Sequence, residues 1–444
     1  MKTEERNVFD MNLKRRIAII LTGLLLVTMM TGCSGKQSTS QASSSEETIT
    51  IRFAGWGEPE EKELYATQIL PAFEKEHPNI KVKYEHIPAD FTGKMNVALA
   101  SGSAPDVFYV GDGDFSRWAK LGQLYNIQEF VDQEQFDLTD IFEQALVRYR
   151  YDGTITGKGD LYCLPMDIAP IVMYYNKELF DAAGVAYPSA EEPMTWEELL
   201  EVGQKLTDES KRQYGIGSIW WEGMVWGNGG QILSDDRTEF VLNEEKGAEA
   251  MQFIADCTNK YGICPPQTLL DSQGADQMFE TGKVAMYITG RYMVPPFRKL
   301  NFDWDIAPQP CNGEWSGYSA STGFGISAKT KEAEVAWELV KFLSGKEANE
   351  LRAGLCMPIY KSMASTDLVL QPDEKPSHSE VFVTAAQNQQ PGPWTYVPDN
   401  KWWDTLNQNL SRVWEGKEPA QDILTELKPQ IEKALKEGNP DLYQ

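Results

Sequence analysis

Histidine and cysteine are scarce in this sequence of 444 residues, and that scarcity argues against several kinds of site. Three histidines are scattered along the chain and no Cys-x-x-Cys pair occurs among six cysteines, so zinc binding is not expected. Gly-x-Gly-x-x-Gly and Gly-Lys-Ser/Thr are absent, which argues against dinucleotide and P-loop nucleotide sites. Nothing indicates a Ser-His-Asp triad. The sequence therefore predicts no metal and no cofactor.

Basic residues are also in short supply, with 41 lysines and arginines against 66 acidic residues and a net charge of −25. Beyond residue 32, 36 basic and 63 acidic side chains remain, or −27. This balance argues against nucleic acid and against an anionic membrane surface as direct partners. It fits a soluble protein with a neutral or cationic ligand, although acidity that only promotes solubility explains it equally well.

The first 32 residues predict a signal peptide. A basic stretch, residues 14–16, precedes an apolar run from Ile17 to Met30, which is short for a membrane span but typical of a signal sequence. Met30-Thr31-Gly32-Cys33 is similar to a bacterial lipobox, with methionine in place of the usual leucine. Cys33 is therefore expected to be lipidated and to become the first mature residue. A secreted protein with an unmodified cysteine is the alternative, and both Met1 and Met11 remain candidate initiators.

Residues 33–47 are rich in Ser, Thr, Gln and Glu and predict a flexible tether. A lipidated cysteine followed by a tether makes the mature protein anchored to the membrane rather than spanning it. We expect it on the extracellular face of the bacterial cytoplasmic membrane. Of the remaining five cysteines, Cys257 and Cys264 flank a predicted helix end. A disulfide between them stays open, and buried free thiols are the default expectation for all five.

The rest of the chain is organised around the stretch from Ile49 to Asn126, whose pattern is strand, helix, strand, helix, strand. This order predicts an α/β fold with a mainly parallel sheet and helices on its faces. The chain is longer than one core usually holds, and 41% hydrophobic residues are ample for two domains. In sheets of this kind, ligands bind outside the carboxyl ends of the strands.

Four side chains follow those strand ends: Trp56 and Glu58 after the first strand, and Asp112 and Asp114 after the third. An aromatic ring beside carboxylates suits a polyhydroxylated ligand, because rings stack on sugar faces and carboxylates accept hydrogen bonds from hydroxyls. The alternatives are core packing for Trp56, a helix N-terminal charge for Glu58, and helix N-capping for the two aspartates.

Two extended runs predict crossings between domains. The run from Leu161 to Asn176 is interrupted by Pro165 and Pro170, which argues for a crossing rather than a central strand. The second run, Ser319 to Ile326, is rich in small residues. Asp167 in the first crossing and two small polar residues in the second are candidate ligand contacts; the latter are Ser321 and Thr322.

Two helical segments carry further signals. Thr195 and Glu198 form a predicted capping box at a helix start. Residues 219–230 hold three tryptophans and read as a helix that ends in a Gly-rich loop. Trp226 and Asn228 from this segment are candidate ligand contacts, although other large aromatics nearby could fill the core instead.

With these motifs in order, the sequence resembles the extracellular solute-binding proteins of ABC sugar importers, the maltose-binding-like family. The resemblance covers about residues 48 to 440, and each marker alone is weak. The markers are Gly55-Trp56-Gly57, Pro105-Asp106-Val107, Tyr174-Tyr175-Asn176-Lys177-Glu178-Leu179-Phe180, Gly282-Lys283-Val284-Ala285-Met286, Gly323-Phe324-Gly325-Ile326-Ser327 and the lipobox cysteine.

The resemblance implies a two-lobe periplasmic-binding-protein-like fold, with two or three crossings and a ligand cleft that closes by a hinge motion. It places lobe 1 at about residues 48–166 and 318–361, and lobe 2 at about 167–317 and 362–444. It also implies a ligand-stacking role for Tyr292, whereas the neighbouring Arg291 could instead pair with a structural acid. Trp402 and Trp403 match the family's late aromatic, one expected in the cleft and one in the core, with Trp394 a weaker candidate.

The expected function is capture of a mono- or oligosaccharide outside the cell and its delivery to a membrane permease, by a monomer that performs no covalent chemistry. Two alternatives remain open. The same fold could bind a non-sugar solute such as a polyamine, peptide or metal chelate, because fold does not determine ligand. A secreted glycoside hydrolase would also combine tryptophan with two acids, about 5–10 Å apart.

Overall fold

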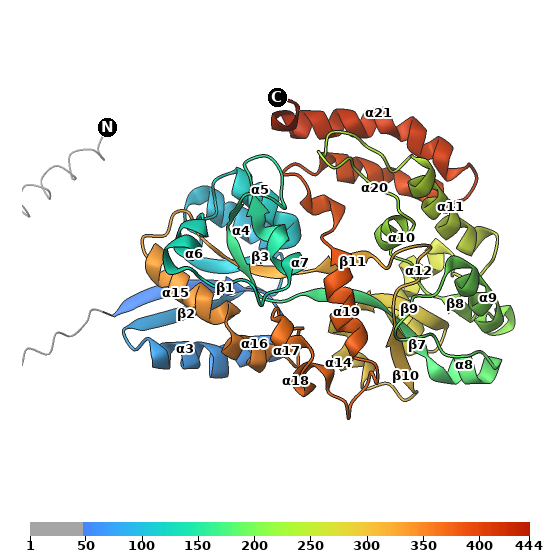
Figure 1. The fold of residues 1–444 in the computed structure, drawn as a ribbon, viewed down its shortest axis with the longest axis horizontal. Helices are drawn as coiled ribbons and strands as arrows, with labels where there is room; N and C mark the ends of the chain where they lie inside the picture. Colours follow the sequence, from blue (N-terminus) through green and yellow to red (C-terminus); the bar gives the residue numbers. More distant parts are fainter. Residues whose placement is uncertain (1–47) are drawn as a thin grey trace, which may run out of the picture. The chain divides into compact units, whose positions relative to one another are not determined.

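Two β-sheets organise residues 48–444, the part of the chain that the structure, a computed structural model, describes (Figure 1). The predicted signal peptide, the predicted lipidation site Cys33 and the predicted tether lie outside the described residues. Within residues 48–444, no helix combines the length and apolar character needed to cross a bilayer.

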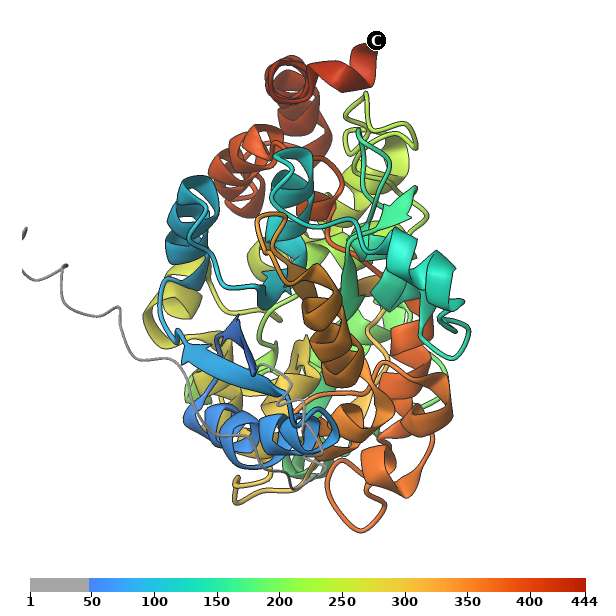
Figure 2. The ribbon, with the colours of Figure 1, turned by 90° about the vertical axis from the view of Figure 1, so that its left-hand side faces the viewer.

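Sheet 1 has five strands in the order β2-β1-β3-β12-β6. The three N-terminal strands run parallel, as predicted, whereas β12 runs antiparallel to both β3 and β6 and makes the sheet mixed. Phe53 of β1 lies opposite Val107 of β3, so the loops that follow these two strands leave the same sheet edge. Figure 2 looks onto the half of the molecule that contains this sheet. The strands are β1 (Ile49–Gly55), β2 (Ile80–His86), β3 (Val107–Gly111), β6 (Cys163–Pro165) and β12 (Thr322–Ile326).

Sheet 2 has the order β13-β11-β7-β9-β8, and β10 also pairs with β7. Strand β7 is therefore central, so the preference for a crossing over a central strand is wrong for this strand, although the segment that leads into it does cross between the sheets. Pro170 is the second residue of β7, where a missing N–H disturbs the ladder least, and the next amide, Ile171 N–H, donates to Gln389 Oε1 at 2.8 Å. The strands are β7 (Ala169–Asn176), β8 (Tyr214–Ile216), β9 (Val284–Gly290), β10 (Trp304–Ala307), β11 (Gly317–Ala320) and β13 (Gln389–Gln390).

The chain passes between the sheets at both predicted crossings. The first link joins β6 of sheet 1 to β7 of sheet 2 and contains Asp167. The second joins β11 of sheet 2 to β12 of sheet 1 through Ser321. Residues from two distant parts of the sequence therefore meet where the sheets are connected.

The apolar side chains of both sheets are buried, and one buried cluster contains residues of both, such as Phe53 of β1 and Tyr174 of β7. In sheet 1 the rings of Phe53 and Phe324 pack against Tyr109, with centroids 5.7 and 5.6 Å apart. In sheet 2 the core side chains include Met286 and Ile288, both fully buried. Apolar burial of this kind supplies most of the folding free energy, so the two sheets act as frames that hold the linking segments between them.

The remaining elements connect and cover the sheets (Figure 1). A two-stranded hairpin is formed by β4 (Arg150–Tyr151) and β5 (Asp160–Leu161). The helices before it are α2 (Pro59–Leu64), the π-helical turn η1 (Tyr65–Ile69), α3 (Leu70–Glu76), α4 (Phe91–Ser101), α5 (Asp112–Lys120), α6 (Gln128–Glu134), α7 (Glu143–Leu146) and the 3-10 turn η2 (Val147–Tyr149). Those after it are α8 (Lys177–Ala183), α9 (Trp196–Leu206), η3 (Glu209–Lys211), α10 (Trp221–Gly227), α11 (Glu245–Asn259), α12 (Gln267–Gln273), α13 (Ala275–Glu280), η4 (Arg291–Met293), α14 (Val294–Phe297), α15 (Ala333–Ser344), α16 (Lys346–Arg352), α17 (Lys361–Ala364), α18 (Asp367–Leu370), α19 (Glu380–Asn388), η5 (Pro393–Thr395), α20 (Lys401–Trp414), α21 (Ala420–Gly438) and η6 (Pro440–Tyr443).

Helix α9 begins with the predicted capping box. The Glu198 amide donates to Thr195 Oγ1 at 3.2 Å, and the Thr195 amide donates to Glu198 Oε2 at 2.8 Å. Replacing Thr195 with alanine leaves the Glu198 amide without its acceptor, so we expect the free energy of unfolding to fall by about 1 kcal/mol. Urea unfolding measures this. Thr405→Ala is the control, because that hydroxyl donates only to the Lys401 carbonyl inside α20; equal losses in the two variants would contradict the capping role.

Candidate ligand-binding site

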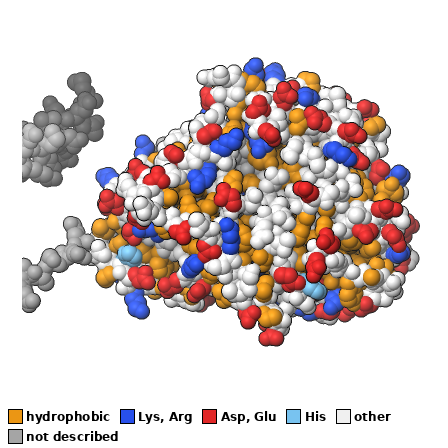
Figure 3. All heavy atoms as spheres, viewed as in Figure 1, with side chains coloured by type: hydrophobic (Ala, Val, Ile, Leu, Met, Phe, Trp, Pro, Cys, Tyr) orange, Lys and Arg blue, Asp and Glu red, His pale blue; other side chains and the backbone are white. Residues whose placement is uncertain are grey.

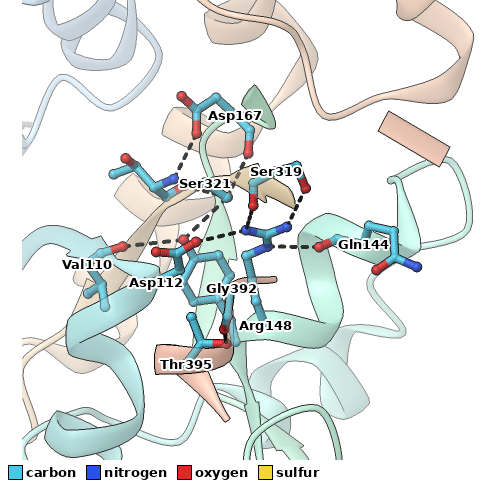
Figure 4. A network of polar contacts seen from close by, with 11 residues as sticks. Val110, Asp112, Gln144, Arg148, Asp167, Ser319, Ser321, Gly392 and Thr395 are labelled. Carbon is cyan, nitrogen blue, oxygen red and sulfur yellow. Dashed lines mark hydrogen bonds and ion pairs between the residues drawn. The ribbon is translucent and has the colours of Figure 1, made fainter. Parts of the chain in front are cut away.

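A buried hydrogen-bond network joins the two sheets at the crossings (Figure 4). Its centre is Arg148 of η2, whose side chain is fully buried. The guanidinium donates to Asp112 Oδ2 at 2.9 Å, to the Ser319 carbonyl at 2.8 Å and to Ser319 Oγ at 2.9 Å, while Nε donates to the Gln144 carbonyl at 2.8 Å. Since Asp112 follows β3 and Ser319 belongs to β11, this one side chain ties sheet 1 to sheet 2.

The same network accounts for Asp112 without a ligand. Asp112 is the first residue of α5 and does not cap the helix through its side chain; Gly111 occupies the N-cap. Burial raises the pKa of Asp112, while the Arg148 guanidinium beside it opposes the rise. The ligand contact predicted for Asp112 stays a prediction, but its carboxylate is already engaged by a buried cation.

The three polar residues predicted at the crossings lie together. Asp167 Oδ1 accepts the Thr322 amide at 2.8 Å, and the Asp167 carbonyl accepts the Ser321 hydroxyl at 2.7 Å. The Tyr149 hydroxyl also donates to Ser321 Oγ at 3.3 Å. The two crossings are thereby hydrogen-bonded to each other, and one oxygen of the Asp167 carboxylate is held by backbone.

A cavity of about 200 Å³, the hinge cavity, opens beside these residues. Tyr292 lies in it with 51% of its surface exposed, the largest exposed fraction of any tyrosine in the described chain. Its ring folds back over Gly290, where a Cβ would lie 2.2 Å from Tyr292 Cε1, so a larger residue at position 290 would displace the ring. The cavity is lined by Asp167, Ile168, Ala169, Arg291, Tyr292, Ala320, Ser321, Thr322, Leu355, Cys356 and Met357.

The hinge cavity contains two charged side chains that are shielded from water, Arg291 and Asp167. Arg291 is buried and donates to the carbonyls of Ala353 and Val369 at 3.3 and 3.5 Å, so its suggested pairing with an acid is wrong within the described residues. Burial raises the pKa of Asp167 to about 6, although the Thr322 amide and the Arg352 guanidinium lower it. The ionised form of such a carboxyl is stabilised most when a ligand hydroxyl or cation donates the hydrogen bonds that water no longer provides.

The raised pKa of Asp167 predicts a pH dependence of stability. Between about pH 4 and pH 6 the unfolded chain is ionised at this position while the folded protein still holds the proton, so the contribution of Asp167 to the free energy of unfolding falls as pH rises through this window. Asp167→Asn removes this titration. The free energy of unfolding of the variant should therefore rise by about 1–2 kcal/mol relative to that of wild type as the pH increases across the window.

Urea unfolding at several values between pH 4 and pH 7 measures that gain. Asp137→Asn is the control, because hydrogen bonds from Thr139 lower the pKa of Asp137 and its contribution therefore has the opposite sign. A constant difference between Asp167→Asn and wild type over the whole range would contradict the assignment.

Trp56 and Asp114 form a wall on the sheet 1 side. The half-buried Trp56 ring meets Phe91 and Tyr109 edge-on, with centroids 4.8 and 5.0 Å apart. A Cβ built on Gly111 would lie 3.7 Å from both Trp56 Cη2 and Asp114 Oδ2, so the indole and the carboxylate face the same spot. Asp114 accepts the Thr92 hydroxyl at 2.7 Å, and burial raises its pKa.

The neighbouring acids of α2 differ in environment. Glu58 is exposed at the N-cap of α2 and makes no side-chain capping bond. Glu61, which sequence reasoning missed, accepts the Tyr109 hydroxyl at 2.7 Å, and burial raises its pKa. Its only sequence signal is its place in the first turn of α2, shortly after Trp56. Glu60 in the same turn shares that signal, so sequence alone could not single out Glu61.

The sheet 2 side carries a row of aromatic rings in contact with one another, here called the aromatic wall. It consists of Trp220, Trp221, Tyr318, Trp394 and Trp403. Trp220 stacks on Tyr318 at 5.3 Å, Tyr318 meets Trp394 at 4.9 Å, and Trp394 meets Trp403 at 5.3 Å. A Cβ on Gly113 would lie 3.3 Å from Trp394 Cδ1, so the aromatic wall reaches the start of α5 on the opposite side.

Other predicted site residues lie in the core. Trp226 is 6% exposed and packs in the sheet 2 core, and Trp402 is fully buried there while Trp403 faces the aromatic wall. Asn228 is buried and bonded to the Lys246 carbonyl and to Glu249, at 2.9 and 3.0 Å. None of these three buried residues lines the hinge cavity. Their ligand contacts stay predictions, and packing accounts for each.

A second and larger space, the mouth cavity of about 540 Å³, lies between α5 and the segment that leads into α20. Lys120 Nζ pairs with Asp441 Oδ2 at 2.9 Å, and the Ser116 hydroxyl donates to the Val397 carbonyl at 3.2 Å, so α5 contacts the C-terminal segment here. Figure 3 shows acidic and basic side chains interspersed over the visible face. Among residues 48–444, no group of three metal-ligating side chains is placed to hold an ion.

Comparison with known proteins agrees with this geometry. A family model described as "Bacterial extracellular solute-binding protein" matches residues 57–350, more than half of the chain. The chain therefore belongs to the family of bacterial extracellular solute-binding proteins.

Individual relatives are more distant. A galactooligosaccharide-binding protein of Bacillus subtilis is 24% identical over 429 residues, covering 92% of this chain and 94% of the relative. An ABC substrate-binding protein from Listeria monocytogenes, solved in complex with cycloalternan, superposes with a TM-score of 0.75 at 26% identity, covering 88% of this chain and 99% of that one. The sugar-binding protein MalE from Xanthomonas citri gives a TM-score of 0.75 at 20% identity, covering 89% and 100%. The predicted two-lobe α/β fold is confirmed.

Proposed function

We propose that this protein is the solute-binding component of an ABC importer, which captures a mono- or oligosaccharide outside the cell and delivers it to a membrane permease. The observation that carries the proposal is the hinge cavity, where the exposed ring of Tyr292 and the Asp167 carboxyl lie at the junction of the two crossings. A ring and a poorly solvated carboxyl are the groups that stack on a sugar face and accept its hydroxyl hydrogens.

Both sheets carry further groups that suit a sugar ligand. Trp56 and Asp114 stand on the sheet 1 side, and the aromatic wall stands on the sheet 2 side. Closing them on a ligand excludes water and strengthens each hydrogen bond inside. We propose lobes at about residues 48–166 with 318–361, and 167–317 with 362–444. The pairing of β11 with β7 of sheet 2 supports moving the proposed boundary from 318 towards Ser321.

The names of the relatives support a carbohydrate ligand and a transport role, since they include galactooligosaccharide- and maltodextrin-binding proteins. We further propose a monomer anchored through lipidated Cys33 on the extracellular face of the membrane, with no covalent chemistry of its own. The permease recognises the closed form, in which both lobes present surface together.

Titration calorimetry on the full chain tests the proposal. A panel of monosaccharides, malto-oligosaccharides and galacto-oligosaccharides is titrated beside a polyamine and a mixture of short peptides. We expect saturable heat from one sugar class and none from the polyamine or peptides. Tight binding of a polyamine or peptide together with no response to any sugar would overturn the proposal. Hydrolysis of a sugar in the calorimeter cell would identify a glycoside hydrolase instead.

A further inference from the structure

Two cysteines outside the ligand site are held close together by the backbone. Cys257 lies near the end of α11, and Cys264 follows the turn after that helix. The amides of Ile263 and Cys264 both donate to the Cys257 carbonyl, at 2.9 and 3.2 Å. This geometry brings the two Cα atoms into the range that a disulfide spans, roughly 4.4–6.8 Å.

The two side chains are buried in the same apolar cluster. The neighbouring Cys257 thiol and burial raise the pKa of the Cys264 thiol well above that of a free cysteine. Cys257 is fully buried and Cys264 is 7% exposed. Cys264 also lines a cavity of about 170 Å³ next to Trp414, so one sulfur of the pair borders open space. Both are free thiols in the structure.

We propose that Cys257 and Cys264 form a disulfide bond in the exported protein. The proposal rests on the extracellular location given under the proposed function, because disulfides form and persist in oxidising compartments. The oxidant is a thiol–disulfide oxidase outside the cytoplasm. Its own disulfide accepts two electrons and two protons and becomes a dithiol, while the two cysteine thiols lose them and the S–S bond forms.

The burial of the two cysteines indicates when during folding the disulfide can form. Only a thiolate attacks a disulfide, and in the packed protein the neighbouring Cys257 thiol and burial raise the pKa of the Cys264 thiol. We therefore expect the bond to form during folding, before α11 is covered.

The bond would secure one side of the aromatic wall. Ile263, between the two cysteines, accepts the Ile216 amide of β8 at 3.0 Å, so the turn is part of the edge of sheet 2. Helix α11 packs against α10, which carries Trp221. Cross-linking the end of α11 to this turn restricts the unfolded chain and holds α10 against its sheet.

The other cysteines in residues 48–444 provide internal controls. Cys163 is buried in β6, the Cys311 thiol donates to the Gly313 carbonyl, and the Cys356 thiol donates to the Arg352 carbonyl. They lie on separate elements and are expected to remain free thiols.

Peptide mapping of the full chain tests the proposal directly. The protein is secreted from a bacterial host, collected without reductant, quenched in acid, alkylated and digested with trypsin. Lys260 lies between the two cysteines, so trypsin places them in different peptides, residues 247–260 and 261–283. We expect these peptides to be joined, two hydrogens lighter than their sum and separable by reduction, whereas Cys163, Cys311 and Cys356 are alkylated. Recovery of both peptides separately and alkylated would overturn the proposal.

A pair of variants separates the bond from its consequences. Cys257→Ser should abolish the joined peptide and lower the melting temperature measured without reductant. Cys163→Ser, the control, should keep the joined peptide. Sugar titration of the same wild-type sample distinguishes the two proposals, because binding without a disulfide leaves the proposed function standing and refutes only the cross-link.

Discussion

Replacing Tyr292 with alanine is expected to weaken sugar binding about thirtyfold, which corresponds to about 2 kcal/mol. The ring lines the hinge cavity and is 51% exposed, so its contacts are available to a ligand rather than spent on the core. For the same reason the free energy of unfolding should change little. Calorimetry with the best sugar of the panel and urea unfolding of the same variant measure the two effects.

Tyr187→Ala is the matched control for that experiment. Tyr187 is also an exposed tyrosine, at 42%, but its hydroxyl donates to Asp181 on α8 and it lies outside the hinge cavity. Its removal should leave sugar affinity unchanged. Equal losses of affinity in the two variants, or none in Tyr292→Ala, would refute the stacking role.

Replacing Arg148 with methionine is expected to lower the free energy of unfolding by about 3–5 kcal/mol. The substitution leaves the buried Asp112 carboxylate without its cation and removes both bonds to Ser319, which tie the two sheets together. Urea unfolding measures the loss. The exposed Arg412, paired with Glu418 and Glu426, is the control, and Arg412→Met should have a far smaller effect.

A double-mutant cycle identifies the source of that loss. If the stranded Asp112 charge is the main cost, Asp112→Asn combined with Arg148→Met should be more stable than Arg148→Met alone. Strictly additive losses would show that the arginine acts through packing and its bonds to Ser319, not through the ion pair.

The parts of the fold that sequence could predict are those that local patterns determine. The strand and helix order of residues 49–126, the capping box at Thr195 and both crossings follow from periodicity, turn residues and prolines that act within a few positions. The central position of β7 was missed because the effect of Pro170 depends on its exact place in the strand, which only the partner strands reveal.

The candidate site also contains residues that the sequence could predict and residues that it could not. Asp167, Ser321 and Thr322 could be proposed because each lies within or beside a recognisable extended segment, and Tyr292 could be proposed from the family resemblance. The structure brings all four to one cavity. The pairing of Asp112 with Arg148 could not be proposed, since nothing local links two charges 36 positions apart.

The aromatic wall was hidden for a related reason. Its rings come from three separate segments, around residues 220, 318 and 394–403, and tryptophan is as common in cores as in binding sites. Within residues 219–230, Trp226 packs inside while Trp220 and Trp221 join the aromatic wall, a difference that depends on how α10 is rotated against its neighbours.

A crystal structure of the full chain soaked or grown with the tightest-binding sugar tests the account most directly. It should show a sugar ring stacked on Tyr292, with a hydroxyl donating to the Asp167 carboxylate and Trp56 or the aromatic wall closing over the far side. Sugar density on another surface, with the hinge cavity unchanged, would contradict it.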